Sequence, residues 1–575
     1  MPTRRLFSVL LAVVAAFALA ACGSDEGGGS SDDGGAAVAL DGAATLAPAN
    51  APLYFEANIT PQGDQAEALD ELVANISDGK VTDARAELIK ELNKSLGEQN
   101  VSFERDIEPW LGGSAAIFAS SLKSLSSGTT TTPSDTSAPA AATPIGLRQA
   151  QGGGGSLTTP SLPGLGSLNT NPSDFEGAVV LETKDAGKTK AFVDKVSGAG
   201  AQEKKYKDTS YKLDSSEPVA VGVIKGKYLV LGNEASFKQA VDTASGGQSL
   251  AGNPAFEKAV KATPGGLAFG YLDSEGLKQS AAQSTGSLGQ QAQAFDMLFG
   301  QFDAIAFGAG VEDDAIEIDS AVIGAAEQPT DPGDLIKEMP ADSFAAFGVG
   351  AVGAQADQFL KQLNALDQSG ELERQLKSMG LDLKRDVFSW MGDAAGFVRG
   401  SSMRDLDAAL VVETTDPAKT KALINQVKPL LNLAEAAAGS SGDIKVEPLG
   451  RAEADDGLKV TTPQVPFPIS IGVKGERFAI AVGDDALADA FGSTKRLGDS
   501  DAFKAAADQL DDGVDPMLYA NLPQVLALVK SLAGDDPQFA KVEPYLDAFT
   551  QISAGTKSAG DATRSQIVIG VQDRD

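Results

Sequence analysis

A serine and a lysine stand at the spacing of a serine-acylation motif. Residues 120–123 read Ser-Ser-Leu-Lys, which fits the S-x-x-K pattern of acylating enzymes. The companion S-D-N and K-T-G elements do not occur in the sequence, and the tetrapeptide lies where an apolar run gives way to a low-complexity stretch. We therefore interpret this match as accidental and predict no nucleophilic serine here.

Two glutamates at equivalent places in similar stretches could form a hydrolytic pair. Glu182 in VVLETKD and Glu413 in VVETTD each end a strand-like run, and two carboxylates suffice for glycoside hydrolysis. Thr183 and Thr414 follow directly and lead into helix-cap sequences, so a turn or capping role is the simpler interpretation. Only 6% of the residues are aromatic, which is few for an enzyme that stacks sugar rings. A carboxylate-based hydrolase is therefore the weakest of our functional hypotheses.

The composition removes most other catalytic and metal-binding arrangements. The sequence contains no histidine, so the commonest general base and the commonest metal ligand are both missing. Cys22 is the only cysteine, which excludes an internal disulfide and a thiol nucleophile elsewhere in the chain. We predict no catalytic residue, no metal site and no cofactor.

Two further patterns resemble ligand-binding motifs but lack the residue spacing that those motifs require. Gly222 to Lys227 faintly resembles a phosphate-binding loop, but the spacing differs from G-x-x-x-x-G-K-[ST] and predicts a hairpin turn at Lys225-Gly226. The acidic clusters at 312–314 and 508–515 lack the alternating oxygen ligands of an EF-hand loop. We interpret both clusters as hydrated turns.

Both tryptophans of the chain lie in one repeated phrase. FERDIEPWLG (103–112) returns as LKRDVFSWMG (383–392), so Trp110 and Trp390 hold equivalent positions. Such indoles could line ligand-binding grooves, which makes them candidate binding residues. They could equally be packing anchors covered by the adjacent Arg-Asp pair, and this second interpretation accounts for the whole phrase.

Further repeated blocks follow in the same order. Residues 179–196 match 410–427, residues 219–241 match 469–491, and Leu250 with Ala255-Phe256 matches Leu497 with Ala502-Phe503. Four matched blocks in one order predict two tandem copies of one unit. We place the first copy at 45–324, a linker at 325–339 and the second copy at 340–575. A Ser/Thr/Pro/Gly-rich stretch at about 120–171 interrupts the first copy and predicts a disordered insert.

Each copy alternates strand-like and helix-like segments. LYFEANI (53–59) and AVVLET (178–183) predict strands, and Asp185 and the pair Asp416-Pro417 predict helix starts. Hairpin signals within each copy indicate a mainly antiparallel sheet with helices packed on one face. The predicted class is therefore α+β, with two tandem copies of this arrangement.

The first residues predict export and lipid attachment. A basic start, an apolar run from Leu6 to Ala21 and then Cys22 predict a signal peptide at 1–21. Leu19-Ala20-Ala21-Cys22 resembles the lipobox of bacterial lipoproteins, which implies cleavage before Cys22 and a diacylglycerol on its sulfur. Residues 22–44, rich in Gly, Ser and acids, predict a flexible tether. We expect an extracytoplasmic protein anchored to the bacterial membrane, exported by the general or the twin-arginine route.

The charge excludes one class of partner. The net charge of −32 repels phosphate backbones, so we predict no nucleic-acid binding.

The chain also resembles an uncharacterised family of large bacterial envelope proteins, catalogued as domain of unknown function 3352. The resemblance rests on APLYFEANI, RDIEPWLGG and AVVLETKDAGKTKAFVDKV and spans most of the chain that follows the tether. It implies a location in the envelope and no mechanism.

These observations lead to one main hypothesis and two alternatives. The first is a non-enzymatic envelope lipoprotein that binds a lipid or other apolar ligand between sheet and helices, or a protein partner. The second is a structural or scaffolding envelope protein without a small ligand. The third is the carboxylate-based hydrolase.

Overall fold

The computed structural model describes residues 40–572 except for 82, 98–100, 122–174, 198–199, 215–217, 264–265, 284–300, 313, 326–333, 357–359, 361–373, 375–376, 379, 403, 439–443, 464, 535 and 537–538. Cys22, the signal peptide and nearly all of the predicted disordered insert lie outside these residues.

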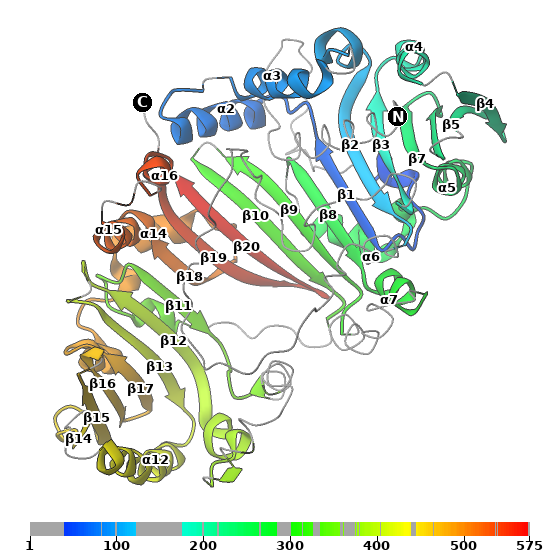
Figure 1. Cartoon of the computed structure of the whole chain (residues 1–575). Helices are drawn as coiled ribbons and strands as arrows, with labels where there is room; N and C mark the ends of the chain where they lie inside the picture. The colour runs from blue at the N-terminus through cyan, green and yellow to red at the C-terminus, as the bar shows by residue number, and fades with distance from the viewer. Residues whose placement is uncertain are drawn as a thin grey trace, which may run out of the picture.

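All strands belong to one antiparallel sheet of 20 strands that twists and curves through the whole molecule (Figure 1). The pairings give the order β4-β5-β6-β7-β3-β2-β1-β8-β9-β10-β20-β19-β18-β11-β12-β13-β17-β16-β15-β14. The α+β class and the antiparallel sheet are confirmed.

The strands of the first half are β1 (Leu53–Asn58), β2 (Leu111–Ala119), β3 (Gly177–Thr183), β4 (Ala201–Tyr206), β5 (Thr209–Asp214), β6 (Val219–Ile224), β7 (Tyr228–Asn233), β8 (Ala268–Asp273), β9 (Ala304–Glu312) and β10 (Ala315–Ile323). Those of the second half are β11 (Ala345–Val349), β12 (Met391–Arg399), β13 (Asp407–Thr414), β14 (Lys445–Pro448), β15 (Asp456–Thr462), β16 (Val465–Lys474), β17 (Arg477–Val482), β18 (Asp515–Asn521), β19 (Phe549–Ala559) and β20 (Ala562–Val571).

The two halves meet edge to edge along β10 and β20. Ala315 pairs with Gly570 and Ile323 with Ala562, and Asp319 stands opposite Gln566 at the middle of the seam. Outward from this seam, β20 to β14 follow one another in the same relative order as β10 to β4. The outermost strands, β4 and β14, are short and carry Lys and Glu residues, which protects the open edges from further pairing.

The helices are α2 (Asp64–Ser77), α3 (Ala84–Gly97), α4 (Ala186–Val196), α5 (Glu234–Ala244), α6 (Pro254–Ala262), α7 (Ser274–Gln283), α12 (Pro417–Ala438), α13 (Ala486–Gly492), α14 (Asp501–Asp508), α15 (Leu522–Ala533) and α16 (Phe539–Leu546). Short helical turns include η1 (Ala43–Thr45), η2 (Phe103–Ile107), η5 (Leu335–Glu338) and η6 (Leu383–Val387).

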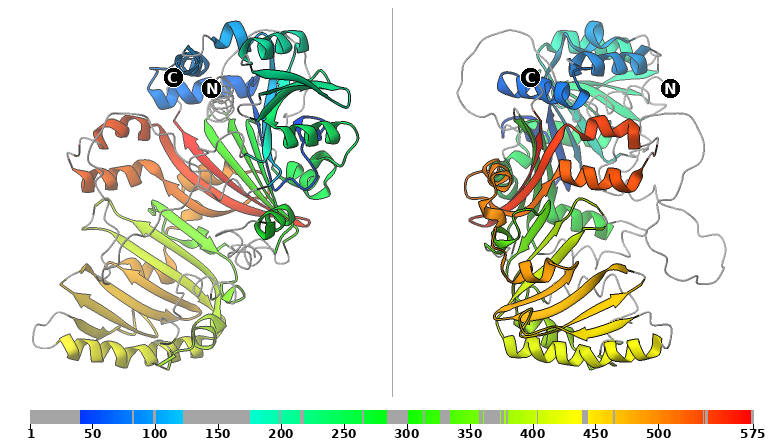
Figure 2. Two further views of the ribbon diagram at one scale, coloured as in Figure 1. Left: turned by 45° about the vertical axis from the view of Figure 1, so that its right-hand side comes forward. Right: turned by 90° about the vertical axis from the view of Figure 1, so that its left-hand side faces the viewer.

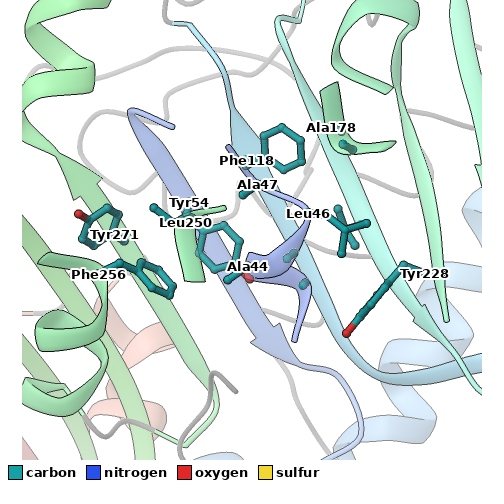
Figure 3. Packing of buried hydrophobic residues seen from close by; sticks show 14 of the residues in the cluster. Ala44, Leu46, Ala47, Tyr54, Phe118, Ala178, Tyr228, Leu250, Phe256 and Tyr271 are labelled. Atoms are coloured by element: carbon teal, nitrogen blue, oxygen red, sulfur yellow. The ribbon is translucent and has the colours of Figure 1, made fainter. Parts of the chain in front are cut away.

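One face of the sheet, the closed face, is covered along both halves. In the first half α5, α6 and η1 pack on it around Tyr54, Phe118 and Phe256 (Figure 3). The Phe256 ring meets the Tyr54 ring edge-on at 5.5 Å and the Tyr271 ring at 5.0 Å. In the second half α13, α14 and η5 cover the same face.

Helices also pack on the opposite face, so the prediction of helices on one face only is wrong. There, α3 and α4 cover β2, β3 and β7, whereas α12 covers β13, β16 and β17. The reason is visible in β3, whose residues Gly177–Thr183 are nearly all buried on both sides. A continuous apolar strand of this kind requires cover on both faces.

Some segments expected to be connectors belong to the cores. Ala43 and Ala44, at the end of the predicted tether, are buried in the first-half core. Leu335 and Ile336, at the end of the predicted linker, are buried in the second-half core.

A buried polar network lies under the seam on the closed face. Arg564 on β20 donates to Asp319 Oδ1 at 2.8 Å and pairs with Asp511 at 2.5 Å. The side chain of Asp319 is only 3% exposed. Gln566, fully buried, accepts the backbone N–H of Asp511 at 2.8 Å and donates to Glu317 at 3.4 Å. Burial raises the pKa of Glu317 to about 7.

We expect Arg564→Met to destabilise the protein strongly, because it leaves the carboxylate of Asp319 buried without its cation. Removing one partner of a buried ion pair costs about 3–5 kcal/mol. The matched control is Arg105→Met, whose side chain is 62% exposed, so that loss of its pair with Asp106 should change the stability little. Urea denaturation at pH 7 measures both variants, and equal midpoints would contradict the role given to Arg564.

Candidate functional site

The middle of the sheet is uncovered on the side opposite the closed face. We call this surface the open face; among the described residues no helix crosses it, and Figure 1 shows β8, β9, β10, β20 and β19 from this side. Large apolar side chains 37–44% exposed lie on it, which is unusual for a sheet in contact with water. They are Phe307, Ile318, Phe347, Leu410, Ile480, Leu518 and Ile567.

The strand register places most of these side chains in one continuous row. Its members, in order across β9, β10, β20, β19, β18, β11, β12, β13 and β17, are Ala309, Ile318, Ile567, Ala554, Leu518, Phe347, Gly396, Leu410 and Ile480. With strands about 4.8 Å apart, nine strands give a row about 38 Å long. A side chain at Gly396 would collide with the ring of Phe347, so the glycine lets that ring lie flat along the row.

No charged residue of β8, β9, β10 or β20 points to the open face. Their open-face residues are Ala268, Gly270 and Leu272 on β8, Ile305, Phe307, Ala309 and Val311 on β9, Ile316, Ile318, Ser320 and Val322 on β10, and Thr563, Ser565, Ile567, Ile569 and Val571 on β20. The charged residues Glu317, Asp319 and Arg564 of the same strands face the closed side. The usual pattern, apolar residues inward and polar residues outward, is therefore inverted at the seam.

Helices frame the open face without covering its middle. Ala68, Leu69 and Leu72 of α2 pack on Val311 and Val571 at one end of β9 and β20. At the side of β18 and β19, α15 and α16 lie on the opposite side of the sheet from α14 (Figure 2). The result is an apolar, uncharged sheet surface with helices at its borders.

Sequence reasoning missed this surface. Its signal is present in AIEIDSAVI (315–323), where isoleucines and acids alternate, but alternation alone assigns the acids to the solvent side. The ligand between sheet and helices stays a prediction; the described sheet–helix interfaces contain clusters of buried apolar side chains.

The two tryptophans occupy equivalent core positions. Trp110 and Trp390 are 1% and 0% exposed, and each indole N–H donates to the backbone carbonyl four residues earlier, at 2.7 and 2.8 Å. The carbonyl of Trp110 accepts the N–H of Lys184, as that of Trp390 accepts the N–H of Thr415. This geometry favours the packing interpretation over the binding one.

The other candidate groups are dispersed. Glu182 on β3 and Glu413 on β13 are separated by eleven strand spacings, about 53 Å along the sheet, so they form no catalytic pair. Ser120 lies at the end of β2 and Lys123 outside the described residues. Asp185 caps α4 by accepting the N–H groups of Gly187 and Lys188, as predicted.

A surface cavity of about 530 Å³ lies beside Arg399 in the second half. Aspartates dominate its lining, but Arg399 already pairs with Asp342, Asp407 and Asp489. Within the described part of the chain, no group of acidic residues is arranged to hold a metal ion, and no helix has the length and apolar character to span a bilayer.

One buried carboxyl has an unusual environment on the closed face. Glu56 is 2% exposed and accepts the hydroxyl hydrogen bond of Tyr54. Burial raises the pKa of Glu56 to about 7, and the charge of Glu182 acts in the same direction. Because Glu56 is buried and its hydrogen-bond partner Tyr54 belongs to the cluster shown in Figure 3, we assign it a structural role.

Comparison with known proteins places the chain among sequences of unknown function. A family model described as "Protein of unknown function (DUF3352)" matches residues 7–569. No curated protein matches. A solved structure titled "Structure of crystal form I of TP0453" is 9% identical, with 49% of this chain and 80% of that chain covered and a TM-score of 0.21.

We predict that the tryptophan emission of the native protein is that of buried indoles. Iodide should quench it weakly, and the addition of a fatty acid should leave its wavelength unchanged, because both indoles are fully covered. A ligand-dependent shift of the emission would instead show that Trp110 or Trp390 contacts the ligand.

We also expect Glu56→Gln to flatten the pH dependence of stability. The folded protein holds the Glu56 proton up to a pKa of about 7, whereas the unfolded chain releases it near 4.5. The unfolding free energy therefore falls as the pH rises from about 4.5 to 7, by at most about 3 kcal/mol from this group. Urea denaturation at pH 4.5, 6 and 8 should show a smaller fall for Glu56→Gln, which keeps an acceptor for Tyr54; an equal fall would refute the assignment.

Proposed function

The chain belongs to the DUF3352 family, whose function is unknown, and we propose that it is a non-enzymatic lipoprotein of the bacterial envelope that binds lipid acyl chains on its open face. The observation that carries this proposal is the row of exposed apolar side chains across nine strands. In a chain with a net charge of −32, such a surface gains free energy only when something apolar covers it.

Acyl chains fit this surface better than a protein partner does. Protein interfaces rely on Tyr, Trp and Arg anchors with a polar rim, whereas the open-face positions of β8, β9, β10 and β20 hold only aliphatic residues, Phe, Gly, Ser and Thr. An acyl chain needs no hydrogen-bonding partner. Covering one exposed Ile or Phe side chain contributes roughly 1 kcal/mol, so a row of them can hold a long chain.

The size of the row indicates the class of lipid. An ordinary acyl chain spans one leaflet, about half of a bilayer core that is about 30 Å thick. The row of about 38 Å therefore accommodates more than one such chain, or one unusually long chain. This supports a lipid with several chains or with very long chains as the ligand.

We further propose that the two halves are tandem copies of one ancestral unit. The shared strand order, the equivalent tryptophan contacts and the matching hydroxyl pairs, Thr183 with Thr189 at 2.5 Å and Thr414 with Thr420 at 2.7 Å, support this. Antiparallel pairing of β10 with β20 would then join the same strand of each copy. In this proposal the open face exists only when the two copies are paired, because its middle is made of β10 from one copy and β20 from the other.

The anchoring part of the proposal rests on the sequence. Leu19-Ala20-Ala21-Cys22 supports lipidation of Cys22 and attachment to the outer side of the cell membrane. The absence of histidine supports a role without catalysis.

Extraction of the native protein in mild detergent, followed by native mass spectrometry, tests the proposed ligand. We expect added mass from bound lipid in the parent protein. Ile318→Asp with Ile567→Asp, two neighbours across the seam, should lose at least about nine-tenths of that lipid, because each carboxylate faces the bound chains.

The control is Val465→Asp on β16, an equally exposed apolar position outside the row. It should keep the lipid. A bare mass for gently extracted parent protein, with no uptake of a fluorescent fatty acid, would overturn lipid binding and favour the scaffolding role.

A further inference from the structure

A second exposed apolar surface lies on the helix hairpin formed by α15 and α16. The large apolar side chains that are exposed in the described chain number thirteen, and five of them are on these two short helices. Leu532 is 60% exposed, and Val542 and Tyr545 are each 48% exposed. The others are Val529 and Leu546.

The apolar stripe of the hairpin points away from the protein. Val542, Tyr545 and Leu546 are spaced i, i+3 and i+4, so they share one face of α16. No residue of α16 is buried. On an ordinary surface helix such a stripe packs on the core, whereas here the core contact comes from Leu526 of α15 and from contacts of α16 with α2.

Three charged side chains of the hairpin, each partly exposed, form ion pairs between its two helices. Lys530 of α15 pairs with Glu543 of α16 at 2.8 Å and with Asp547 at 3.3 Å. This pairing joins the two helices and offsets one of the two acidic charges. The outer surface therefore presents aliphatic side chains and Tyr545, with Lys541 exposed on the same helix.

A lipid bilayer is the partner that this surface fits. Tyr and Lys beside aliphatic residues are typical of helices that lie in the membrane interface. With 12 and 8 residues, the helices are too short to span a bilayer, which takes about 20. A second copy of the chain would bring another net charge of −32 to the contact.

The hairpin also adjoins the open face. α15 packs on β18 and β19, which carry Leu518 and Ile552 of that face, and α16 contacts α2 (Figure 2). Residues 22 to 40 can span at most ~60 Å, so a protein anchored at Cys22 remains within reach of its membrane.

We propose that the α15–α16 hairpin docks on the surface of the bilayer and brings the border of the open face to the membrane, so that acyl chains pass between the two. The passage of acyl chains to the open face rests on the proposed function. The docking of the hairpin on the bilayer does not depend on that function.

Vesicle flotation tests docking with the chain from residue 22 onward, made without the predicted signal peptide and with Cys22→Ser, so that neither the apolar run Leu6–Ala21 nor a lipid anchor binds the vesicles. The vesicles contain phosphatidylcholine alone, so that no net vesicle charge repels the acidic protein. We expect this protein to bind them and Leu532→Asp with Leu546→Asp to weaken binding by about tenfold or more. Val465→Asp is the control for added charge and should bind as the parent does. Circular dichroism melting confirms that each variant is folded.

A second measurement separates this inference from the proposed function. The hairpin variant should still take up a fluorescent fatty acid in solution, whereas Ile318→Asp with Ile567→Asp should lose uptake and still bind vesicles. Vesicle binding unchanged in the hairpin variant, or absent in the Cys22→Ser parent, would overturn docking alone. A hairpin-dependent dimer in sedimentation without vesicle binding would assign the surface to a second copy instead. If the parent protein takes up no fluorescent fatty acid, the proposed function is overturned and the docking is not.

Discussion

The antiparallel pairing of β10 with β20 is the interaction on which the rest of the structure depends. Either half alone would end in a long strand with a free row of backbone N–H and C=O groups, which is a site for aggregation. The pairing satisfies those groups and turns two ten-stranded sheets into one. Under it, Arg564, Asp319 and Gln566 form a polar network that is buried on the closed face. At this pairing the charged side chains therefore lie on the closed face, whereas Ile318 and Ile567 lie on the open face.

This inversion determines what the two faces can do. The closed face is filled by helices along both halves, with aromatic packing around Phe256 in the first and around Phe503 in the second. On the opposite face, the helices of the described residues lie only toward the two ends of the sheet and along its borders. A row of apolar side chains about 38 Å long thus crosses the middle of the sheet of an acidic protein. The proposed binding of acyl chains and the proposed docking of the α15–α16 hairpin on a bilayer rest on the same kind of observation, apolar side chains exposed at the surface.

The repeated tryptophan phrase anchors the sheet in each half, and in the second half it adjoins that surface, because Trp390 packs with Val412 and Phe478 next to Leu410 and Ile480 of the row. In each half a single π-helical turn, η2 or η6, presents an arginine to solvent, holds the paired aspartate largely covered and turns the following tryptophan into the core. Asp106 and Asp386 each accept the backbone N–H four residues earlier, at 2.9 and 2.8 Å, which holds the turn closed. The phrase stabilises the start of β2 and β12, and through them the scaffold on which the open face is built.

The sequence by itself determined the local elements, because their causes lie within a few residues. Asp185 caps a helix, Lys225-Gly226 adopts the positive φ angles of a hairpin turn, and the membership in the family rests on contiguous motifs. Only the tertiary structure decided that helices cover both faces, that Glu317 and Asp319 point inward, and that an apolar face stays open. Those outcomes follow from the pairing of β10 with β20, whose partners are about 250 residues apart. Alternation of apolar and polar residues along a strand indicates that its two faces differ. Which face meets water is decided only by the elements that pack beside the strand in space.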